Sequence, residues 1–286
     1  MNDVSVFDSR PCSLGEGPLW HPERGELYWF DINAKKLLGP NGSEWEFDAF
    51  VSAAGWVDKD QLLIASDRDL RVFDLSNGSS ESILNLETEI ADTRSNDGRA
   101  DPFGGFWIGT MHVSASGAVG SIYRFYKGEV RKLYSAIEIP NSICFSPDGL
   151  WAYWTDTVDG RILKQALNQK DGWPVADPIE FANPKAEGWN PDGSVVDANG
   201  VLWNAQYGGY RVAGYDPSGQ EIAAFTLPAK QATCPAFGGP GLADLFVTTA
   251  QQGMGTETLA VEPLNGQTFC ISGVGNGQKE HRVILG

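Results

Sequence analysis

Residues 15–38, GEGPLWHPERGELYWFDINAKKLL, hold the pattern that decides the fold. The run opens on Gly and Pro, continues into the apolar residues PLW, crosses the polar turn ERGE and ends in the aromatic and β-branched run LYWFDI. Short apolar runs on both sides of a polar turn are typical of a β-hairpin. The segment therefore predicts two antiparallel strands.

This arrangement occurs six times along the chain. The equivalent points of the six copies are Glu16, Ala54, Asn96, Asn141, Asp192 and Cys234. Their spacing of 38 to 51 residues matches the roughly 40 to 50 residues of a four-stranded propeller blade. A solenoid of helix pairs has a similar period, but these segments alternate with period two and are interrupted by Gly and Pro. The sequence predicts an all-β fold, a six-bladed β-propeller with four-stranded antiparallel blades.

The repeats run through nearly the whole chain of 286 residues, and no linker or low-complexity tract divides it. We therefore expect a single propeller domain over residues 1–286. A ring of blades leaves few free strand edges when the first and last blades meet. The run VSVFDS at residues 4–9 is expected to add a strand to the final blade, whose closing strand is GQTFCISG at residues 266–273.

Composition excludes several classes of partner. The chain has 21 Lys and Arg against 37 Asp and Glu, a formal net charge of −16, which repels a phosphate backbone and argues against nucleic acid. This acidity is explained by solubility or, alternatively, by a cleft that attracts cations. The N-terminus lacks a signal-peptide pattern, and no apolar run is long enough to span a membrane. We expect a cytoplasmic protein that is a monomer or a weak homodimer.

Four oxygen-bearing side chains occupy the repeat starts. In a propeller the connections that enter the innermost strands gather at one end of the tunnel, so Glu16, Asn96, Asn141 and Asp192 are expected to converge. Carboxylate and amide oxygens suit a hard cation such as Ca²⁺, Mg²⁺ or Mn²⁺. Taken alone, each of these residues could instead cap a turn. Their recurrence at the same position of the repeat favours the interpretation as metal ligands. No His falls at this point, although zinc on oxygen ligands remains open.

Four motifs carry a resemblance to a known family. They are LGEGPLW at Leu14, SNDGRADPFGGFWIGTM at Ser95, IPNSICFSPDG at Ile139 and NPDGSVVDANGVLWNAQYGG at Asn190. Together they resemble the SMP-30/gluconolactonase/regucalcin family over roughly residues 10 to 250. The resemblance implies a six-bladed propeller that binds one divalent ion through Glu16, Asn141 and Asp192, and Arg94 and Asn96 as substrate contacts.

The chain departs from the family pattern after the GTM segment, where many relatives carry a substrate-binding Glu. Here the residues are Met111, His112, Val113 and Ser114, so His112 becomes a candidate substrate contact. Aromatic residues in such repeats usually lie in the core, although Tyr207 and Trp56 could wall the pocket. The departure leaves the sugar open, and the ion could be calcium, zinc, manganese, magnesium or iron(II).

The family resemblance implies a metal-dependent hydrolase that opens the ester ring of a sugar acid lactone in carbohydrate catabolism. The metal would polarise the carbonyl and activate water, and Asp192 would be the base. The GxSxG motif of a serine hydrolase is absent. Two alternatives are a metal-dependent phosphotriesterase or esterase on the same fold, and a non-catalytic propeller that binds calcium or carbohydrate.

Overall fold

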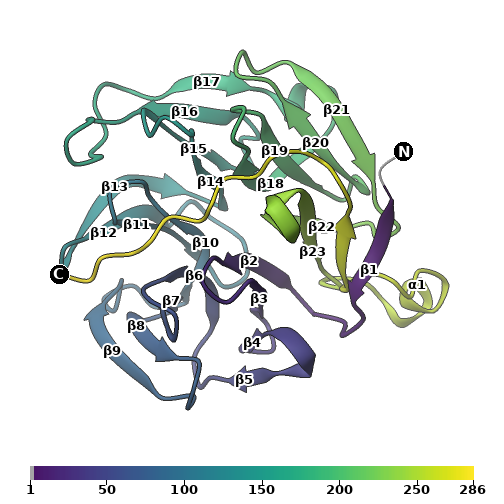
Figure 1. Cartoon of the computed structure of the whole chain (residues 1–286), viewed down its shortest axis with the longest axis horizontal. Coiled ribbons are helices and arrows are strands. Elements are labelled where there is room, and N and C mark those ends of the chain that lie inside the picture. The colour runs from purple at the N-terminus through teal and green to yellow at the C-terminus, as the bar shows by residue number, and fades with distance from the viewer. Residues whose placement is uncertain (1–2) are drawn as a thin grey trace.

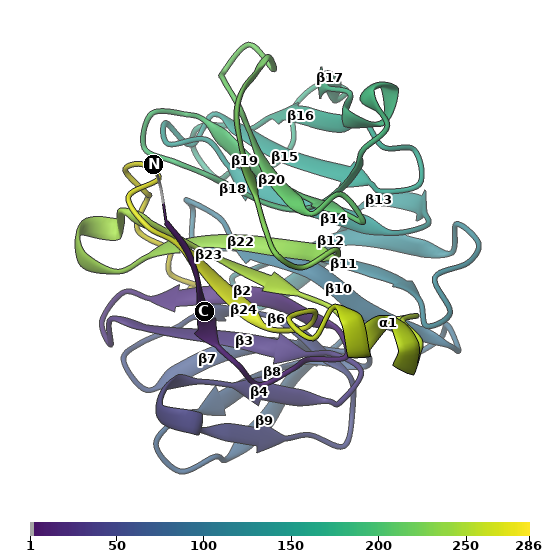
Figure 2. The same cartoon turned by 90° about the vertical axis from the view of Figure 1, so that its right-hand side faces the viewer.

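The structure, a computed structural model, describes residues 3–286. In this part of the chain the strands form six antiparallel sheets of four strands each, arranged as blades around a central tunnel (Figure 1). The predicted six-bladed β-propeller is therefore confirmed. Figure 2 shows the blades from the side, with the short helix α1 (Thr256–Val261) and the C-terminus on opposite sides of the ring.

Each blade has the same strand order from the tunnel outward. The innermost strands are β2 (Gly15–His21), β6 (Val51–Trp56), β10 (Thr93–Ala100), β14 (Pro140–Phe145), β18 (Asn190–Val196) and β22 (Ala232–Gly238). The second strands are β3 (Glu26–Asp31), β7 (Gln61–Ser66), β11 (Phe106–His112), β15 (Trp151–Asp156), β19 (Leu202–Tyr207) and β23 (Asp244–Thr249).

The outer half of each blade is more exposed. The third strands are β4 (Lys36–Leu38), β8 (Asp69–Asp74), β12 (Gly120–Tyr126), β16 (Ile162–Ala166), β20 (Arg211–Tyr215) and β24 (Thr268–Ile271). The outermost strands are β5 (Glu44–Glu46), β9 (Ser80–Asn85), β13 (Glu129–Ile137), β17 (Ile179–Ala182), β21 (Glu221–Thr226) and β1 (Val4–Asp8). Three short 3₁₀ turns, at Pro40–Gly42, Pro184–Glu187 and Pro240–Leu242, lie in connections.

The ring is closed by the first strand of the chain. Strand β1 pairs antiparallel with β24 and completes the blade that β22 and β23 begin. This confirms the predicted roles of residues 4–9 and 266–273. Because the two ends of the propeller share one sheet, separating them requires breaking a ladder of backbone hydrogen bonds rather than opening a side-chain contact alone.

A polar side chain lies at, or one or two residues past, the end of five of the six inner strands. An acceptor atom of this side chain accepts hydrogen bonds from backbone N–H groups in the hairpin turn that leads to the second strand. These bonds stabilise the turn. The residues in this position are His21, Asp58, Asp101, Ser146 and Asp197. They fix the end of the tunnel opposite to the repeat starts.

The hydrophobic core is distributed between blades. Each of the six buried clusters in the described residues lies between two neighbouring blades, for example Leu19, Tyr28, Phe30 and Leu62 between the first and second. Burial of these large side chains holds the blades at fixed angles and so fixes the tunnel. Three cysteines are buried, Cys270 is partly exposed, and all four are free thiols. Within residues 3–286 no helix is long and apolar enough to cross a membrane.

Candidate active site

The inner strands are irregular near their starts. In all six blades the register between the innermost strand and its neighbour shifts there, as between Glu16 and Leu19 or between Asn141 and Cys144. A bulge of this kind turns side chains out of the regular alternation and re-aims them. The repeated shift explains how residues at one phase of the repeat come to face the same end of the tunnel.

Glu16 lies at the shift in the first blade and is buried. The next residue, Gly17, has φ +53°, and a Cβ there would come within 2.2 Å of the Ser52 carbonyl oxygen. Only glycine fits this position without strain. Its N–H donates to Oε2 of Glu16 at 2.8 Å, which orients the carboxylate.

Asn141 occupies the corresponding place in the fourth blade. Its Nδ2 donates to Oγ1 of Thr157 at 2.9 Å, and Thr157 donates in turn to the Pro191 carbonyl oxygen at 2.8 Å. The amide plane is therefore fixed with Oδ1 on the other side. Ser142 follows with φ +60°, and its hydroxyl donates to the Asp192 carbonyl oxygen at 2.6 Å. Strained backbone of this kind concentrates at functional sites.

Asp192 lies at the shift of the fifth blade and is almost fully buried. Its backbone is fixed because its carbonyl oxygen accepts from the Ser142 hydroxyl and from Nδ2 of Asn204, the latter at 3.1 Å. The following Gly193 leaves no room for a side chain, since a Cβ would meet Sγ of Cys234 at 2.4 Å. The carboxylate therefore has a rigid support.

Arg94 and Asn96 stand on β10 and are linked to Asn141. The Arg94 guanidinium donates from Nη1 to Oδ1 of Asn96 at 2.8 Å, and Nδ2 of Asn96 donates to Oδ1 of Asn141 at 3.1 Å. Within residues 3–286 the Nε and Nη2 groups of Arg94 make no hydrogen bond. They remain available to a ligand.

These side chains meet in one cavity of about 250 Å³. Its polar lining is Glu16, Arg94, Asn96, Asn141, Thr157, Asp192, Tyr207 and Gln252, and its apolar lining is Leu14, Met111, Ala115 and Ile139. The five residues Glu16, Arg94, Asn96, Asn141 and Asp192, which come from four blades, therefore face one space. The volume accommodates a single sugar ring.

The carboxyl groups here resist ionisation. Burial, followed by the negative charge of Asp97, raises the pKa of Glu16 to about 8. Burial and then the charges of Glu16 and Asp97 raise the pKa of Asp192 well above its ordinary value. Burial also raises the pKa of Asp97 to about 6 and lowers that of Arg94 to about 10. Three buried acids thus lie close together, and the Arg94 guanidinium is the positive charge that faces Glu16 and Asp192 across the cavity.

The donor set fits a hard cation. Glu16 and Asp192 supply carboxylate oxygens and Asn141 an amide oxygen, and their mutual repulsion would be relieved by a divalent ion. Across residues 3–286 no group of three or more His, Cys, Asp or Glu side chains is arranged to hold a metal. A metal site in this cavity therefore depends on the amide oxygen of Asn141 as the third protein ligand.

Two other candidates lie elsewhere. His112 ends β11 beside the cavity rather than in its lining, and its Nδ1 lies 2.6 Å from Oγ of Ser114. Its predicted substrate contact stays a prediction. Trp56 does not wall the cavity: it ends β6 at the opposite end of the tunnel, where its Nε1 donates to the Glu280 carbonyl oxygen. Tyr207 does line the cavity.

Sequence reasoning missed Thr157 and Gln252. Thr157 follows the aromatic run AYWTD of the fourth repeat and lies outside the repeat starts, so only the fold brings it to Asn141. Gln252 follows β23 in a connection without repeat pattern. The buried Asp97 could have been found, because it stands beside Asn96 in the NDG segment.

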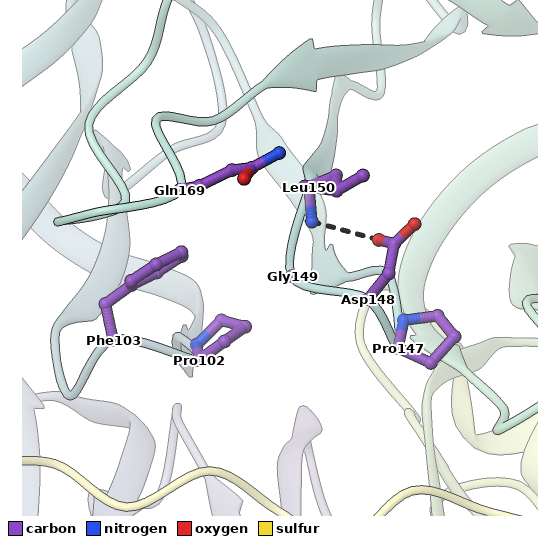
Figure 3. Close-up of a pocket in the computed structure, with 7 residues that line it drawn as sticks. All are labelled: Pro102, Phe103, Pro147, Asp148, Gly149, Leu150 and Gln169. Carbon is purple, nitrogen blue, oxygen red and sulfur yellow. Dashed lines mark hydrogen bonds between the residues drawn. The ribbon is translucent and has the colours of Figure 1, made fainter.

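A second cavity of about 430 Å³ lies where inner strands end (Figure 3). Its lining is Pro102, Phe103, Pro147, Asp148, Gly149, Leu150 and Gln169. The only ionisable group in this lining, the Asp148 carboxylate, accepts from Leu150 N and Ser146 Oγ. The acidic group of this cavity therefore holds the turn between β14 and β15.

A sequence comparison places the chain among known proteins. Residues 14–251 match the profile of the SMP-30/Gluconolactonase/LRE-like region. The chain belongs to this family. Among its members, a putative sugar lactone lactonase of Rhizobium meliloti is 39% identical over 279 residues, which cover 94% of this chain and 95% of that protein. L-arabinolactonase of Azospirillum brasilense is 36% identical and covers 90% of this chain and 87% of its own length.

A solved structure of the family has nearly the same fold. It is a calcium-binding regucalcin of Agrobacterium tumefaciens, with a TM-score of 0.97 and 37% sequence identity, covering 99% of this chain and 98% of that one. The two chains therefore share one fold over nearly their whole length. The family resemblance predicted from the four motifs is confirmed.

Proposed function

We propose that this protein is a metal-dependent hydrolase that opens the ester ring of a neutral sugar acid lactone. The observation that carries the proposal is the convergence of Glu16, Asn141 and Asp192 with Arg94 in one cavity of sugar size. The lactonase names of relatives that match over nearly the whole chain support the reaction type. We propose the same three residues as ligands of one divalent ion.

When bound, such an ion would supply Lewis-acid polarisation of the ester carbonyl and make water more acidic. The protein's own groups supply orientation. The free Nε and Nη2 hydrogens of Arg94 donate to substrate oxygens, and Asn96 holds both Arg94 and Asn141 in place. Fixing the ester against the attacking water removes much of the entropic barrier.

Asp192 carries the proton. Its carboxylate accepts a proton from water as the water oxygen bonds to the carbonyl carbon. The bond between that carbon and the ring oxygen then breaks, and the leaving oxygen takes the proton from Asp192, which yields the open hydroxy acid. The backbone of Asp192 is held by Ser142 and Asn204, which keeps the carboxylate at the cavity wall, where it can accept the proton of the attacking water.

Removing divalent ions is expected to abolish lactone opening. Protein treated with a chelator and then dialysed should lose at least about a hundredfold in kcat/KM, because carbonyl polarisation is lost. The measurement is a pH-indicator assay on glucono-, galactono- and arabinonolactone, corrected for spontaneous hydrolysis, with ions added back one at a time. Full activity after complete removal would contradict the metal role, and activity on phosphotriesters alone would favour the alternative hydrolase.

A phosphorylated lactone should be a poor substrate. Arg94 is the only Lys or Arg among the described residues that line the cavity, and it faces Glu16 and Asp192. Placing a phosphate of about two negative charges there is expected to lower kcat/KM about a hundredfold relative to the neutral lactone. Parallel assays on glucono-1,5-lactone and its 6-phosphate measure the ratio. Equal values would show that the sugar's far end lies outside the cavity.

A further inference from the structure

The C-terminal segment, residues 276–285, crosses the tunnel at the end opposite the cavity (Figure 1). Its contacts are with residues at or just past the ends of inner strands. Nε2 of Gln278 donates to the Val196 and Phe145 carbonyl oxygens, and Val283 N donates to the Trp56 carbonyl oxygen at 2.9 Å. The segment thus bridges the second, fourth and fifth blades.

Close packing fixes this segment. Val283 is fully buried in the cluster between the second and third blades. A Cβ on Gly55 would come within 2.5 Å of Cγ2 of Val283, so the absence of a side chain at Gly55 makes room for it. Together with its hydrogen bonds, this packing leaves a residual space of only about 20 Å³ beside the segment. The tunnel is plugged at this end.

The plug carries a charge into the interior. The carboxylate of Glu280 forms an ion pair with Nη1 of Arg99 on β10, and the two side chains are 8% and 10% exposed. The other polar neighbours of Arg99 are carbonyl oxygens, Ser194 at 3.4 Å and Pro235 at 3.5 Å from Nη2. Among residues 3–286, Glu280 is the only carboxylate within ion-pair distance of Arg99.

Arg99 connects the plug electrostatically to the cavity. Asp97 lies two residues before it on β10, and Oδ2 of Asp97 accepts from Ile143 N at 2.6 Å, in strand β14, which also carries Asn141. On the other side, Nη2 of Arg99 approaches the carbonyl oxygen of Ser194, which follows Asp192 by two residues on β18. From Glu280 toward the cavity the charges therefore run negative, positive and negative as far as Asp97, and the carboxyl groups of Glu16 and Asp192 follow in the cavity.

The interior charges do not cancel. When all of them are ionised, four carboxylates face two guanidinium groups, which leaves an excess of two negative charges, the number that one divalent cation neutralises. The carboxylates are Glu16, Asp97, Asp192 and Glu280, and the guanidinium groups are Arg94 and Arg99. The nearby cations Lys279 and Arg282 lie outside this group, over the ring of Trp56.

We propose that Glu280 is a positioning residue that sets the affinity of the cavity for a divalent cation by neutralising Arg99 from the far end of the tunnel. The inference rests on the proposed metal site and adds to it a group that never touches the ion. With Glu280 uncharged, Arg99 becomes an unpaired buried cation that repels the ion. With Arg99 uncharged, the excess negative charge grows and attracts it.

The test compares two variants that break the same ion pair. Glu280→Gln should weaken binding of Mn²⁺ about tenfold, and Arg99→Gln should strengthen it severalfold, as measured by calorimetric titration of the metal-free full-length protein. Both variants lose stability, because each leaves one buried charge unpaired. The double variant, with both charges removed, should return to the wild-type dissociation constant within about threefold.

Two controls separate charge from docking. Gln278→Ala removes the hydrogen bonds to Val196 and Phe145 without changing charge, so it should lower the melting temperature and leave the Mn²⁺ affinity unchanged. Arg99→Lys keeps the charge and should bind as the wild type does. If both single variants weaken binding, the plug is structural only and the inference is wrong. If wild-type protein binds no divalent ion, the proposed metal site fails and the inference fails with it.

Discussion

Replacing Asp192 by asparagine is expected to lower kcat/KM for sugar lactone opening by about a thousandfold while the protein stays folded. The asparagine keeps the shape of the side chain but cannot accept the proton from water, and loss of a general base alone costs about 10²- to 10⁴-fold. It also removes one of the two proposed carboxylate ligands. The indicator assay at saturating metal gives the rate, and titration of the metal-free variant gives the loss of ion affinity.

A matched control is Asp216→Asn. Asp216 is a partly exposed turn residue outside the cavity lining, and its carboxylate accepts from Ser218 N, so kcat/KM should stay within twofold. Retention of more than a tenth of the activity in Asp192→Asn would assign the base to another group. The fold of the variant can be checked independently, because the carbonyl oxygen of Asp192, not its side chain, holds Ser142 and Asn204.

The same variant should change how stability depends on pH. In the metal-free protein the pKa of Asp192 lies well above its ordinary value because of burial and then the charges of Glu16 and Asp97. The folded state therefore keeps this proton where the unfolded chain has lost it, so the free energy of unfolding falls as the pH rises above the ordinary pKa of 3.8. The melting temperature should fall less between about pH 5 and pH 8 in Asp192→Asn than in the wild type.

The repeat pattern was sufficient for the fold and for most of the cavity. Hairpins with period two specify blades, and a closed ring brings equal points of different blades together, as it does for Glu16, Asn141 and Asp192. The prediction was less accurate where the register shift decides. In the second blade the register shift falls between Val51 and Ala53, so Ala54 lies after the shift. Cys234 packs against Gly193 and does not line the cavity. One residue of bulge is not visible in a repeat spacing.

The features that escaped prediction are not repeated. The plugging segment of residues 276–285 has no strand pattern, and its role follows from Val283 and Glu280 fitting a tunnel that only the assembled ring creates. Trp56 ends an inner strand, so the same ring that brings repeat starts to the cavity carries this side chain to the other end. The sequence pattern likewise did not predict that Arg124, on the third strand of its blade, is fully buried.

The second large effect concerns stability and involves Arg124. Its Nε donates to Oδ2 of Asp101 at 2.7 Å, and both side chains are completely buried. The guanidinium carbon lies 4.4 Å from the ring centre of Tyr126 and 4.5 Å from that of Trp173, while Nη1 and Nη2 have no hydrogen-bond partner in residues 3–286. Asp101 is thus the only carboxylate that forms an ion pair with this buried cation in the described chain.

Asp101→Asn is therefore expected to lower the free energy of unfolding by about 3 to 5 kcal/mol, since removing one partner leaves an uncompensated buried charge. For a chain of this length that lowers the melting temperature by on the order of 10 °C, measured by calorimetry. The side chain also accepts from Phe103 N and Gly105 N, and asparagine keeps an acceptor oxygen for that turn. The loss therefore reports the charge more than the turn.

Two further variants show whether the ion pair itself is responsible. Asp159→Asn breaks an exposed pair with Arg161, whose side chains are 40% and 47% exposed, and should change the free energy of unfolding by less than about 1 kcal/mol. Asp101→Asn combined with Arg124→Met removes both buried charges and should recover part of the loss, because an apolar side chain suits the space between Tyr126 and Trp173. A double variant less stable than Asp101→Asn would mean that stacking on the two rings, rather than pairing with Asp101, is the main contribution of Arg124.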